Sequence, residues 1–255
     1  MNILHVHIVC HAGNSHLVEH ACRAAQRAWP GMPITLLDDE HAPAVSPAAY
    51  AKLDVEYRTT GFARRGNLRG RECLRGLLRE YCKSLKRSQA TYIVKLDPDT
   101  LVLHPDALQG LIFQGVDYAT HSTLDSPFGG GVILMSTFAV HKLLRAVCLC
   151  PIADNAREDM TLGGLALATG IHTAVLDGNT PCVDRPVFFT GLDTARHGDE
   201  SYTSRMALLV AFANVGTSQL TGATRDDEAC MAATLLHAVE EIEKHQKMKK
   251  NYENQ

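Results

Sequence analysis

Two aspartates, Asp97 and Asp99, stand two residues apart where a strand-like apolar run, residues 92–96, ends and a second apolar run begins. Pro98 between them has a fixed φ and no backbone N–H, so the turn is stiff and the two side chains have few relative directions. Carboxylate oxygens spaced in this way suit a hard divalent cation such as Mg²⁺ or Mn²⁺. The segment therefore predicts a metal site, with an ordinary Asp-Pro turn as the alternative.

A run of three glycines precedes the next strongly apolar segment, residues 132–136. Gly129, Gly130 and Gly131 offer no side chain to pack and lose much conformational entropy when they are ordered. Such a run is typical of a place where a ligand or another stretch of backbone comes close. A glycine-rich bulge without a ligand is the alternative.

An acidic pair, Glu158 and Asp159, precedes an apolar segment with helical character, residues 161–169. Free N–H groups and the helix dipole stabilise carboxylates at a helix start, so capping is enough to explain both residues. The spacing alone leaves open whether either acid also takes part in chemistry.

Several side chains near these motifs are of types that contact nucleotides. Asp38 leaves the short apolar run at residues 34–37, where an acidic residue either meets a nucleoside or lies in a solvated turn. Guanidinium groups match phosphate oxygens in bidentate geometry, and a solvated helix face is the alternative. The arginines concerned are Arg64, Arg65, Arg69, Arg71, Arg75 and Arg79.

Apolar periodicity predicts the elements that position these residues. Residues 3–10, 34–37, 92–96, 116–119, 132–136 and 171–176 are typical of strands, and residues 16–28, 74–85, 108–113, 137–148 and 161–169 of helices. The strand, helix, strand order at the start is typical of a parallel sheet. No periodicity is clear between residues 40 and 67, which indicates a lid or a substrate loop.

The composition is that of an ordinary soluble globular protein without a basic field for nucleic acid. The 255 residues (27.8 kDa) include 45% hydrophobic and 21% charged residues, and the net charge is −3. We expect one domain over residues 1–235 and a charged surface helix or tail over residues 236–255. The eight cysteines are scattered without zinc-site spacing and indicate reduced core thiols.

No basic and apolar leader stands at the start, and no apolar stretch reaches roughly 18 residues, so we expect a cytoplasmic protein. The lysines near the end predict a peripheral contact with an anionic membrane at its inner face, worth about 1 kcal/mol for each cation. A solvated tail is the alternative. These residues are Lys244, Lys247, Lys249 and Lys250.

The order of these signals resembles a glycosyltransferase of the GT-A fold. Residues 94–99 (VKLDPD), 129–134 (GGGVIL) and 158–160 (EDM) carry the resemblance, which covers roughly residues 1–200. It implies an α/β architecture, a single Rossmann-like domain whose mostly parallel central sheet is flanked by helices. It also implies a nucleoside-diphosphate sugar as donor, most commonly a UDP-sugar, and Mn²⁺ or Mg²⁺ as cofactor.

The resemblance assigns roles to single residues. Asp99 would ligate the metal directly, Asp97 would contact the metal or the ribose, and His197 would supply a third ligand. The acidic pair is similar to the base motif of inverting members of the β-1,3-galactosyltransferase type. It therefore makes Asp159 the general base and Glu158 its neighbour.

Further residues complete the expected donor site. Gly130 and Gly131 would lie against the donor sugar or the acceptor, where a side chain would clash. His11, Asp38 and Arg71 would contact the nucleotide or its phosphates. The acceptor would be a growing glycan, a lipid-linked sugar or a small soluble molecule.

Some features depart from the family pattern and keep alternatives open. Proline is an unusual middle residue for D-x-D, and His197 lacks the flanking residues of a metal-ligand motif, so a retaining reaction stays possible. A sugar-phosphate nucleotidylyltransferase is a rival, although residues 10–14 (CHAGN) stand in place of its glycine- and arginine-rich loop. A non-catalytic module that binds a sugar or a partner is the third alternative.

Overall fold

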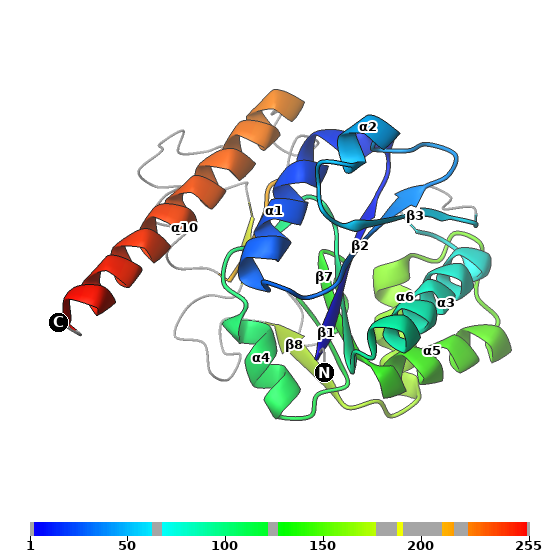
Figure 1. Cartoon of the computed structure of the whole chain (residues 1–255). Helices are drawn as coiled ribbons and strands as arrows, with labels where there is room; N and C mark the ends of the chain where they lie inside the picture. Colours follow the sequence, from blue (N-terminus) through cyan, green and yellow to red (C-terminus); the bar gives the residue numbers. More distant parts are fainter. Residues whose placement is uncertain are drawn as a thin grey trace.

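A seven-stranded sheet forms the centre of the structure, a computed structural model that describes residues 3–62, 68–121, 127–176, 188–190, 211–216 and 224–253 (Figure 1). The strand order is β3-β2-β1-β4-β7-β6-β8. Within this sheet β7 runs antiparallel to both neighbours, and the other pairings are parallel. The strands are β1 (Leu4–Cys10), β2 (Ile34–Asp39), β3 (Glu56–Thr60), β4 (Tyr92–Leu96), β6 (Tyr118–His121), β7 (Val132–Ser136) and β8 (Thr173–Leu176). The mostly parallel α/β sheet predicted from the sequence is confirmed.

A smaller sheet begins directly after the Asp-Pro-Asp turn. Its strands are β5 (Thr100–Val102), β10 (Phe212–Asn214) and β9 (Phe188–Thr190), in the order β5-β10-β9. The apolar run that follows Asp99 therefore leaves the main sheet instead of extending it. As a result, the two aspartates lie at the junction of the two sheets.

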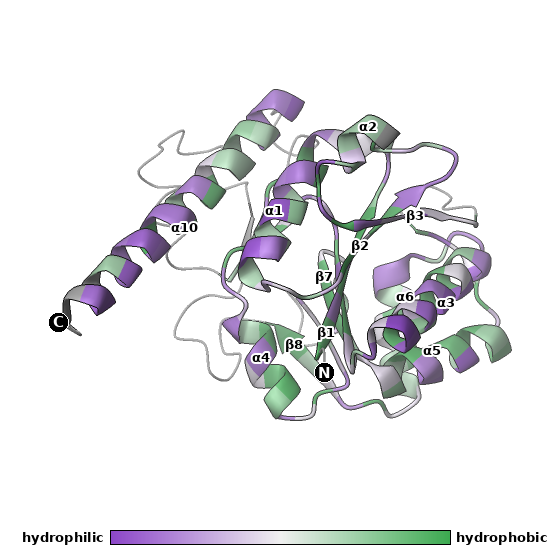
Figure 2. Ribbon diagram, viewed as in Figure 1, coloured by the Kyte–Doolittle hydropathy of each residue, from purple (hydrophilic) through white to green (hydrophobic). Residues whose placement is uncertain are grey.

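Helices cover both faces of the main sheet (Figure 1). One face packs against α1 (Val18–Ala28), α4 (Asp106–Phe113), α10 (Arg225–Glu253) and the smaller sheet. The other face packs against α3 (Arg71–Ser88), α5 (Thr137–Leu149) and α6 (Glu158–Ala168). Two short helices, η1 (Ala12–Leu17) and α2 (Pro47–Tyr50), follow β1 and β2. Figure 2 shows hydrophobic residues on the strands between these layers, whereas α10 carries many hydrophilic residues.

The central strand β1 is buried on both faces, and its side chains alternate between the two cores. Val6 and Ile8 belong to the core beneath α1. His5 and His7 point to the opposite face, where the ring of His7 meets the ring of Tyr81 from α3 with centroids 4.9 Å apart. Because both faces are covered, these two histidines lose their contact with water.

Burial keeps both histidines of β1 neutral. Their rings stack with centroids 4.9 Å apart. Burial lowers the pKa of His5 from 6.5 to about 4, opposed by Glu56 and aided by Arg87 and Arg58. Burial also lowers the pKa of His7 well below 6.5, and His5 and the same two arginines add to this effect. A proton on either ring is therefore strongly disfavoured in the folded state.

We expect these two rings to destabilise the fold in mild acid. In the unfolded chain both histidines bind a proton near pH 6.5, whereas in the folded chain His5 does so only at about pH 4. The unfolded state thus binds more protons below pH 6.5, and the stability present above that pH is lost as the pH falls towards 4. The expected loss is about 1.4 kcal/mol per pH unit for each histidine.

Urea unfolding at pH 7, 6 and 5 measures this loss. In His7→Phe the new ring can still meet Tyr81. As the pH is lowered from 7 to 5, the free energy of unfolding of this variant should decrease less than that of the wild type. His245→Asn changes an exposed histidine of α10 and should follow the wild type. Equal slopes for all three proteins would exclude the buried rings as the cause.

The strand β3 was not anticipated from the sequence. It lies within residues 40–67, where a lid or substrate loop was expected, and pairs in parallel with β2 at the edge of the sheet. Its sequence EYRTT keeps most side chains at least partly exposed, so no apolar alternation marks it. The expectation of a long structureless segment is therefore corrected, while residues 63–67, which include Arg64 and Arg65, lie outside the described residues.

The charged end of the chain belongs to one long helix. α10 spans Arg225–Glu253, so the boundary expected between residues 235 and 236 falls inside a continuous element. Arg23 and Arg27 of α1 pair with Glu240 and Glu243 of α10 at 2.7 Å and 2.5 Å and join the two helices. In the part of the chain that the structure describes, no helix has the length and apolar character needed to cross a membrane.

Candidate active site

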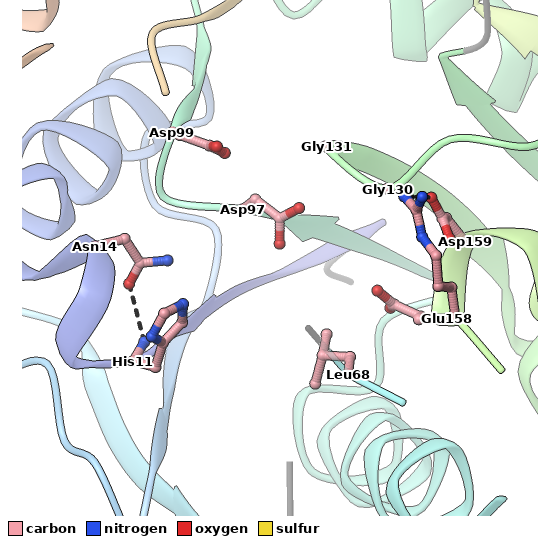
Figure 3. A pocket seen from close by; sticks show the side chains of 10 residues that line it. His11, Asn14, Leu68, Asp97, Asp99, Gly130, Gly131, Glu158 and Asp159 are labelled. Carbon is pink, nitrogen blue, oxygen red and sulfur yellow. Dashed lines mark hydrogen bonds and ion pairs between the residues drawn. The ribbon is translucent and has the colours of Figure 1, made fainter. Parts of the chain in front are cut away.

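A cavity of ≈ 300 Å³ opens at the carboxyl ends of β1 and β4. The strand order reverses at this point, because the chain builds β2 and β3 on one side of β1 and then places β4 on the other side. Ligands of open α/β sheets bind at such switch points. The lining residues, shown in Figure 3, are His11, Asn14, Leu68, Asp97, Asp99, Gly130, Gly131, Arg157, Glu158 and Asp159.

Backbone hydrogen bonds fix the Asp-Pro-Asp turn on one wall of the cavity. The N–H of Asp97 donates to the carbonyl of Gly131 at 3.0 Å, and the N–H of Thr100 donates to the carbonyl of Asp97 at 2.9 Å. The N–H of Val215 donates to the carbonyl of Asp99 at 2.8 Å. Both aspartates are therefore held by the sheets on either side of them.

The Asp99 carboxylate is placed where a positive charge would stabilise it. Its Oδ1 is buried and accepts no hydrogen bond from the described residues. Burial and the charge of Asp97, partly offset by Lys95, raise the pKa of Asp99 to about 7. Gly216 lies so close that an added Cβ would be 2.4 Å from the Asp99 Oδ2. A cation bound here would offset both the desolvation and the repulsion.

The two carboxylates fit a divalent cation that takes part of its coordination from a ligand. Mg²⁺ prefers oxygen ligands and often binds through one or two carboxylates together with phosphates and water. Among the described residues, no group of three His, Cys, Asp or Glu side chains is arranged to hold a metal ion. His197, the predicted third ligand, lies outside these residues.

A buried lysine lies behind the cavity wall. Lys95 is 1% exposed, and its Nζ lies 2.8 Å from Asp97 Oδ1 and 3.1 Å from Glu158 Oε2. It also donates to the carbonyl of Gly130 at 2.6 Å. Burial would lower the pKa of Lys95, but Asp97 and Glu158 raise it above its usual value, so the lysine is charged. Lys95 had no role predicted from the sequence, although a charge in a buried strand indicates partners nearby.

The two acids at the start of α6 have different surroundings (Figure 3). Both acids line the cavity, but Glu158 is buried and pairs with Lys95, whereas Asp159 is partly exposed and pairs with Arg157. Asp159 Oδ2 accepts from Arg157 Nη2 at 2.6 Å, and its Oδ1 accepts from the N–H of Met160 at 2.8 Å. The N-cap position is held by Arg157, so neither acid caps the helix from that position. A carboxylate has about four lone pairs, so Asp159 can still accept from a ligand hydroxyl.

The glycine run is needed where two stretches of backbone meet. A Cβ at Gly129 would lie 1.6 Å from the carbonyl oxygen of His121, which no side chain tolerates. At Gly130 the nearest atoms to an added Cβ belong to Asp159 and Asp97, at 3.5 Å and 3.9 Å. A Cβ at Gly130 would therefore make only ordinary contacts, and Gly130 lines the cavity between the two groups of carboxylates.

The turn after β1 places two polar side chains at the cavity edge (Figure 3). His11 is the N-cap of η1, and its Nδ1 accepts from the N–H of Gly13 at 3.0 Å. Asn14 Oδ1 accepts in return from the N–H of His11 at 2.9 Å. These reciprocal bonds fix the turn, and the structure brings His11 to the same cavity as Asp97 and Asp99.

Asp38 does not line the cavity, which corrects its expected place in the donor site. Its carboxylate is fully buried and accepts from the N–H groups of Ala44 and Val45, at 2.8 Å and 3.1 Å. It also accepts from the hydroxyl of Tyr57 at 3.2 Å. Asp38 therefore stabilises the loop after β2 instead of facing a ligand.

Arg71 is likewise placed away from the cavity, and its expected contact with phosphate is corrected. Its Nε donates to the carbonyl of Val147 at 3.0 Å, and its Nη2 donates to the carbonyl of Cys148. These carbonyls belong to the last turn of α5, where helical partners are missing. The guanidinium is thus engaged in joining α3 to α5.

Three further residues line the cavity and were not predicted from the sequence: Asn14, Leu68 and Arg157. The backbone carbonyl of Leu68 accepts from the N–H of Glu158 at 3.1 Å, and Arg69 forms a β-bridge with Arg157. The approach of two segments that are far apart in the chain brings Leu68 and Arg157 to the cavity. Such a tertiary contact has no signature in local spacing or periodicity.

Two solved structures share this fold over nearly their whole length. The galactosyltransferase LgtC, in complex with donor and acceptor sugar analogues, has a TM-score of 0.50 at 13% identity, covering 93% of this chain and 95% of that chain. A cytidylyltransferase from Leptospira borgpetersenii serovar Hardjo-bovis has a TM-score of 0.51 at 11% identity, covering 97% of this chain and 96% of that chain. No protein-family model and no curated protein matches the sequence. At these identities the likeness shows a shared fold alone.

Proposed function

We propose that the protein is a metal-dependent glycosyltransferase that moves a sugar from a nucleoside-diphosphate sugar, with UDP as the first candidate nucleotide, to an acceptor hydroxyl. The observation that carries the proposal is the convergence of Asp97, Asp99 and Asp159 on one cavity at the switch point of the sheet. The fold shared with a galactosyltransferase supports the same reading.

On the donor side, Asp97 and Asp99 would hold Mn²⁺ or Mg²⁺ together with the donor diphosphate. When bound, the metal neutralises the charge that builds on the leaving diphosphate. The Asp-Pro-Asp turn keeps its carboxylates in place through its backbone bonds to both sheets. His11 and Asn14 border the same cavity and would contact the nucleotide part of the donor.

On the acceptor side, Asp159 would act as general base. The acceptor oxygen forms a bond to the anomeric carbon, the bond from that carbon to the diphosphate breaks, and the hydroxyl proton passes to the Asp159 carboxylate. Direct displacement of this kind inverts the anomeric configuration. Gly130 would leave room for the sugar ring between Asp159 and Asp97. If Asp159 were not the base, the diphosphate oxygen could take the proton and the reaction would be retaining.

A nucleotidylyltransferase is the second candidate, because a cytidylyltransferase shares the fold. This hypothesis is weaker because a nucleotidylyltransferase is expected to have an arginine-rich loop after the first strand. In this chain the turn that leads into η1 places His11 and Asn14 at the cavity, but no arginine. The two candidates differ in their ligands, because a nucleotidylyltransferase binds a nucleoside triphosphate and a sugar phosphate.

We also propose that the acceptor is a glycan or a lipid-linked sugar, with the lysines of α10 resting against an anionic membrane surface at its inner face.

Calorimetric titration with UDP, GDP, CDP, ADP and dTDP, each with and without Mn²⁺, tests the main proposal. We expect one diphosphate to bind much more tightly with metal than without it, because its phosphates complete the coordination begun by Asp97 and Asp99. Titration with the matching triphosphate and a sugar phosphate tests the second candidate. Absence of binding to every nucleotide would favour a non-catalytic binding module over both enzymes.

A further inference from the structure

Lys95 lies where an apolar side chain would be the ordinary choice. It stands in β4 on the face of the sheet that packs against α3, α5 and α6, and it is 1% exposed. Its Nζ has three oxygen partners, which belong to Asp97, Gly130 and Glu158. An ammonium group has three N–H donors, so these three acceptors match its full capacity.

We propose that Lys95 is a positioning residue that holds the Asp-Pro-Asp turn, the glycine run and the start of α6 in one arrangement. This inference rests on the proposed glycosyl transfer, for which the three segments supply the metal site, the sugar space and the base. Lys95 is buried and does not line the cavity. It acts through the groups that it binds.

On the donor side, Lys95 selects which oxygen of Asp97 faces the ligand. The ammonium occupies Oδ1 at 2.8 Å, while Oδ2 is the oxygen nearest to the space beside Gly130. The Asp97 side chain is 30% exposed, so one oxygen is anchored and the other is available to a cation. Loss of the ammonium would let the carboxylate rotate and weaken the metal site.

On the acceptor side, Lys95 holds the first turn of α6. Glu158 is 5% exposed and binds the ammonium at 3.1 Å, and the next residue is Asp159. Without a cation between them, the carboxylates of Asp97 and Glu158 would repel each other. Lys95 thereby fixes the distance between the donor-side and base-side acids.

The alternative is that Lys95 and Glu158 form a purely structural ion pair. Replacing such a pair by apolar residues of similar volume is often neutral for stability. The double variant Lys95→Met/Glu158→Leu separates the two roles, because it removes the cation and its buried partner together but leaves Asp97 without its anchor. A purely structural pair would leave nucleotide binding intact in a variant that folds.

Titration of the double variant with the nucleotide that the wild type binds, at several Mn²⁺ concentrations, tests the proposal. We expect a melting temperature close to that of the wild type and at least a tenfold loss of metal-dependent nucleotide affinity. A higher Mn²⁺ concentration should also be needed for half-maximal nucleotide binding. Arg23→Met/Glu240→Leu removes an ion pair between α1 and α10, outside the cavity, and should bind as the wild type does. Wild-type affinity in the folded Lys95→Met/Glu158→Leu variant would overturn the proposal, whereas a wild type without metal-dependent binding would overturn the proposed function itself.

A measurement on the wild type gives an answer even if the double variant does not fold. With ¹⁵N-labelled lysine, the buried Lys95 ammonium should give a slowly exchanging NMR signal, because its three N–H groups are bonded away from water. Mn²⁺ with the bound nucleotide should broaden this signal, since the ion would sit on the carboxylate that Lys95 holds, while Mg²⁺ should not. A fast-exchanging ammonium, or one that Mn²⁺ leaves sharp, would contradict the assignment.

Discussion

Asp99→Ala is expected to remove the metal-dependent part of nucleotide binding, with a loss of at least about 100-fold in affinity, or about 2.7 kcal/mol. The reason is that Asp99 offers a buried oxygen that accepts no hydrogen bond from the described residues and that suits a cation. Titration with UDP, or with whichever diphosphate binds best, measures the loss when Mn²⁺ is present. Without metal, the wild type and the variant should bind the nucleotide equally weakly.

The stability of the Asp99→Ala variant separates a lost ligand from a damaged fold. Without metal, the variant should melt at or above the wild-type temperature, because a buried carboxylate beside Asp97 is removed. Mn²⁺ with nucleotide should raise the melting temperature of the wild type but not that of the variant. Asp226→Ala, which removes an exposed carboxylate of α10, is the matched control and should behave as the wild type. Metal-dependent binding that persists in Asp99→Ala would exclude Asp99 as a ligand.

Asp159→Asn is expected to slow sugar transfer by about 10² to 10⁴ and to leave donor binding unchanged. The amide oxygen can take the place of Oδ1 and accept from the N–H of Met160, whereas the amide NH2 replaces Oδ2 and ends the bond from Arg157, whose exposed side chain can turn to water. The amide cannot take the proton of the acceptor hydroxyl. Turnover measured alongside nucleotide titration shows whether the loss falls on the chemical step alone.

The first turn of α3 provides a control for the Asp159 variant. Glu72 is also an acid in the first turn of a helix and pairs with Arg75, but it lies outside the cavity. Glu72→Gln should therefore transfer sugar at the wild-type rate. Full activity in Asp159→Asn would discard the base assignment, and NMR analysis of the product anomer would then be expected to show retention.

The sequence predicted the elements well wherever burial leaves an apolar pattern. The strands β1, β4 and β7 are covered on both faces and read as apolar runs, and the Asp-Pro-Asp turn interrupts such a run. The edge strand β3 has partly exposed residues and no such pattern, so it was taken for a loop. Apolar composition decided which strands could be recognised, because the edge strand β8 (TAVL) was predicted although most of its residues are partly exposed.

The site was predictable only in part, because its partners come together through tertiary contacts. Asp97, Asp99, Glu158 and Asp159 attract notice because they carry charge next to apolar runs. The central place of Lys95 could not be derived, since its partners Gly130 and Glu158 stand 35 and 63 residues from it in the chain. The same limit applies to arginines, whose spacing does not show whether a guanidinium meets a phosphate or a helix end.

The reversed direction of β7 has a consequence for motion. Because β7 is antiparallel to β4, the glycine run enters the sheet at the edge where the Asp-Pro-Asp turn leaves it, and the bond from Asp97 to Gly131 continues the pairing of the two strands. Slipping this pair by one residue would turn every side chain to the other face, so its register is fixed. The two walls therefore move as one rigid body without a hinge between them. For the proposed transfer, the Asp-Pro-Asp turn and the glycine run would therefore keep one spacing while substrates enter and leave.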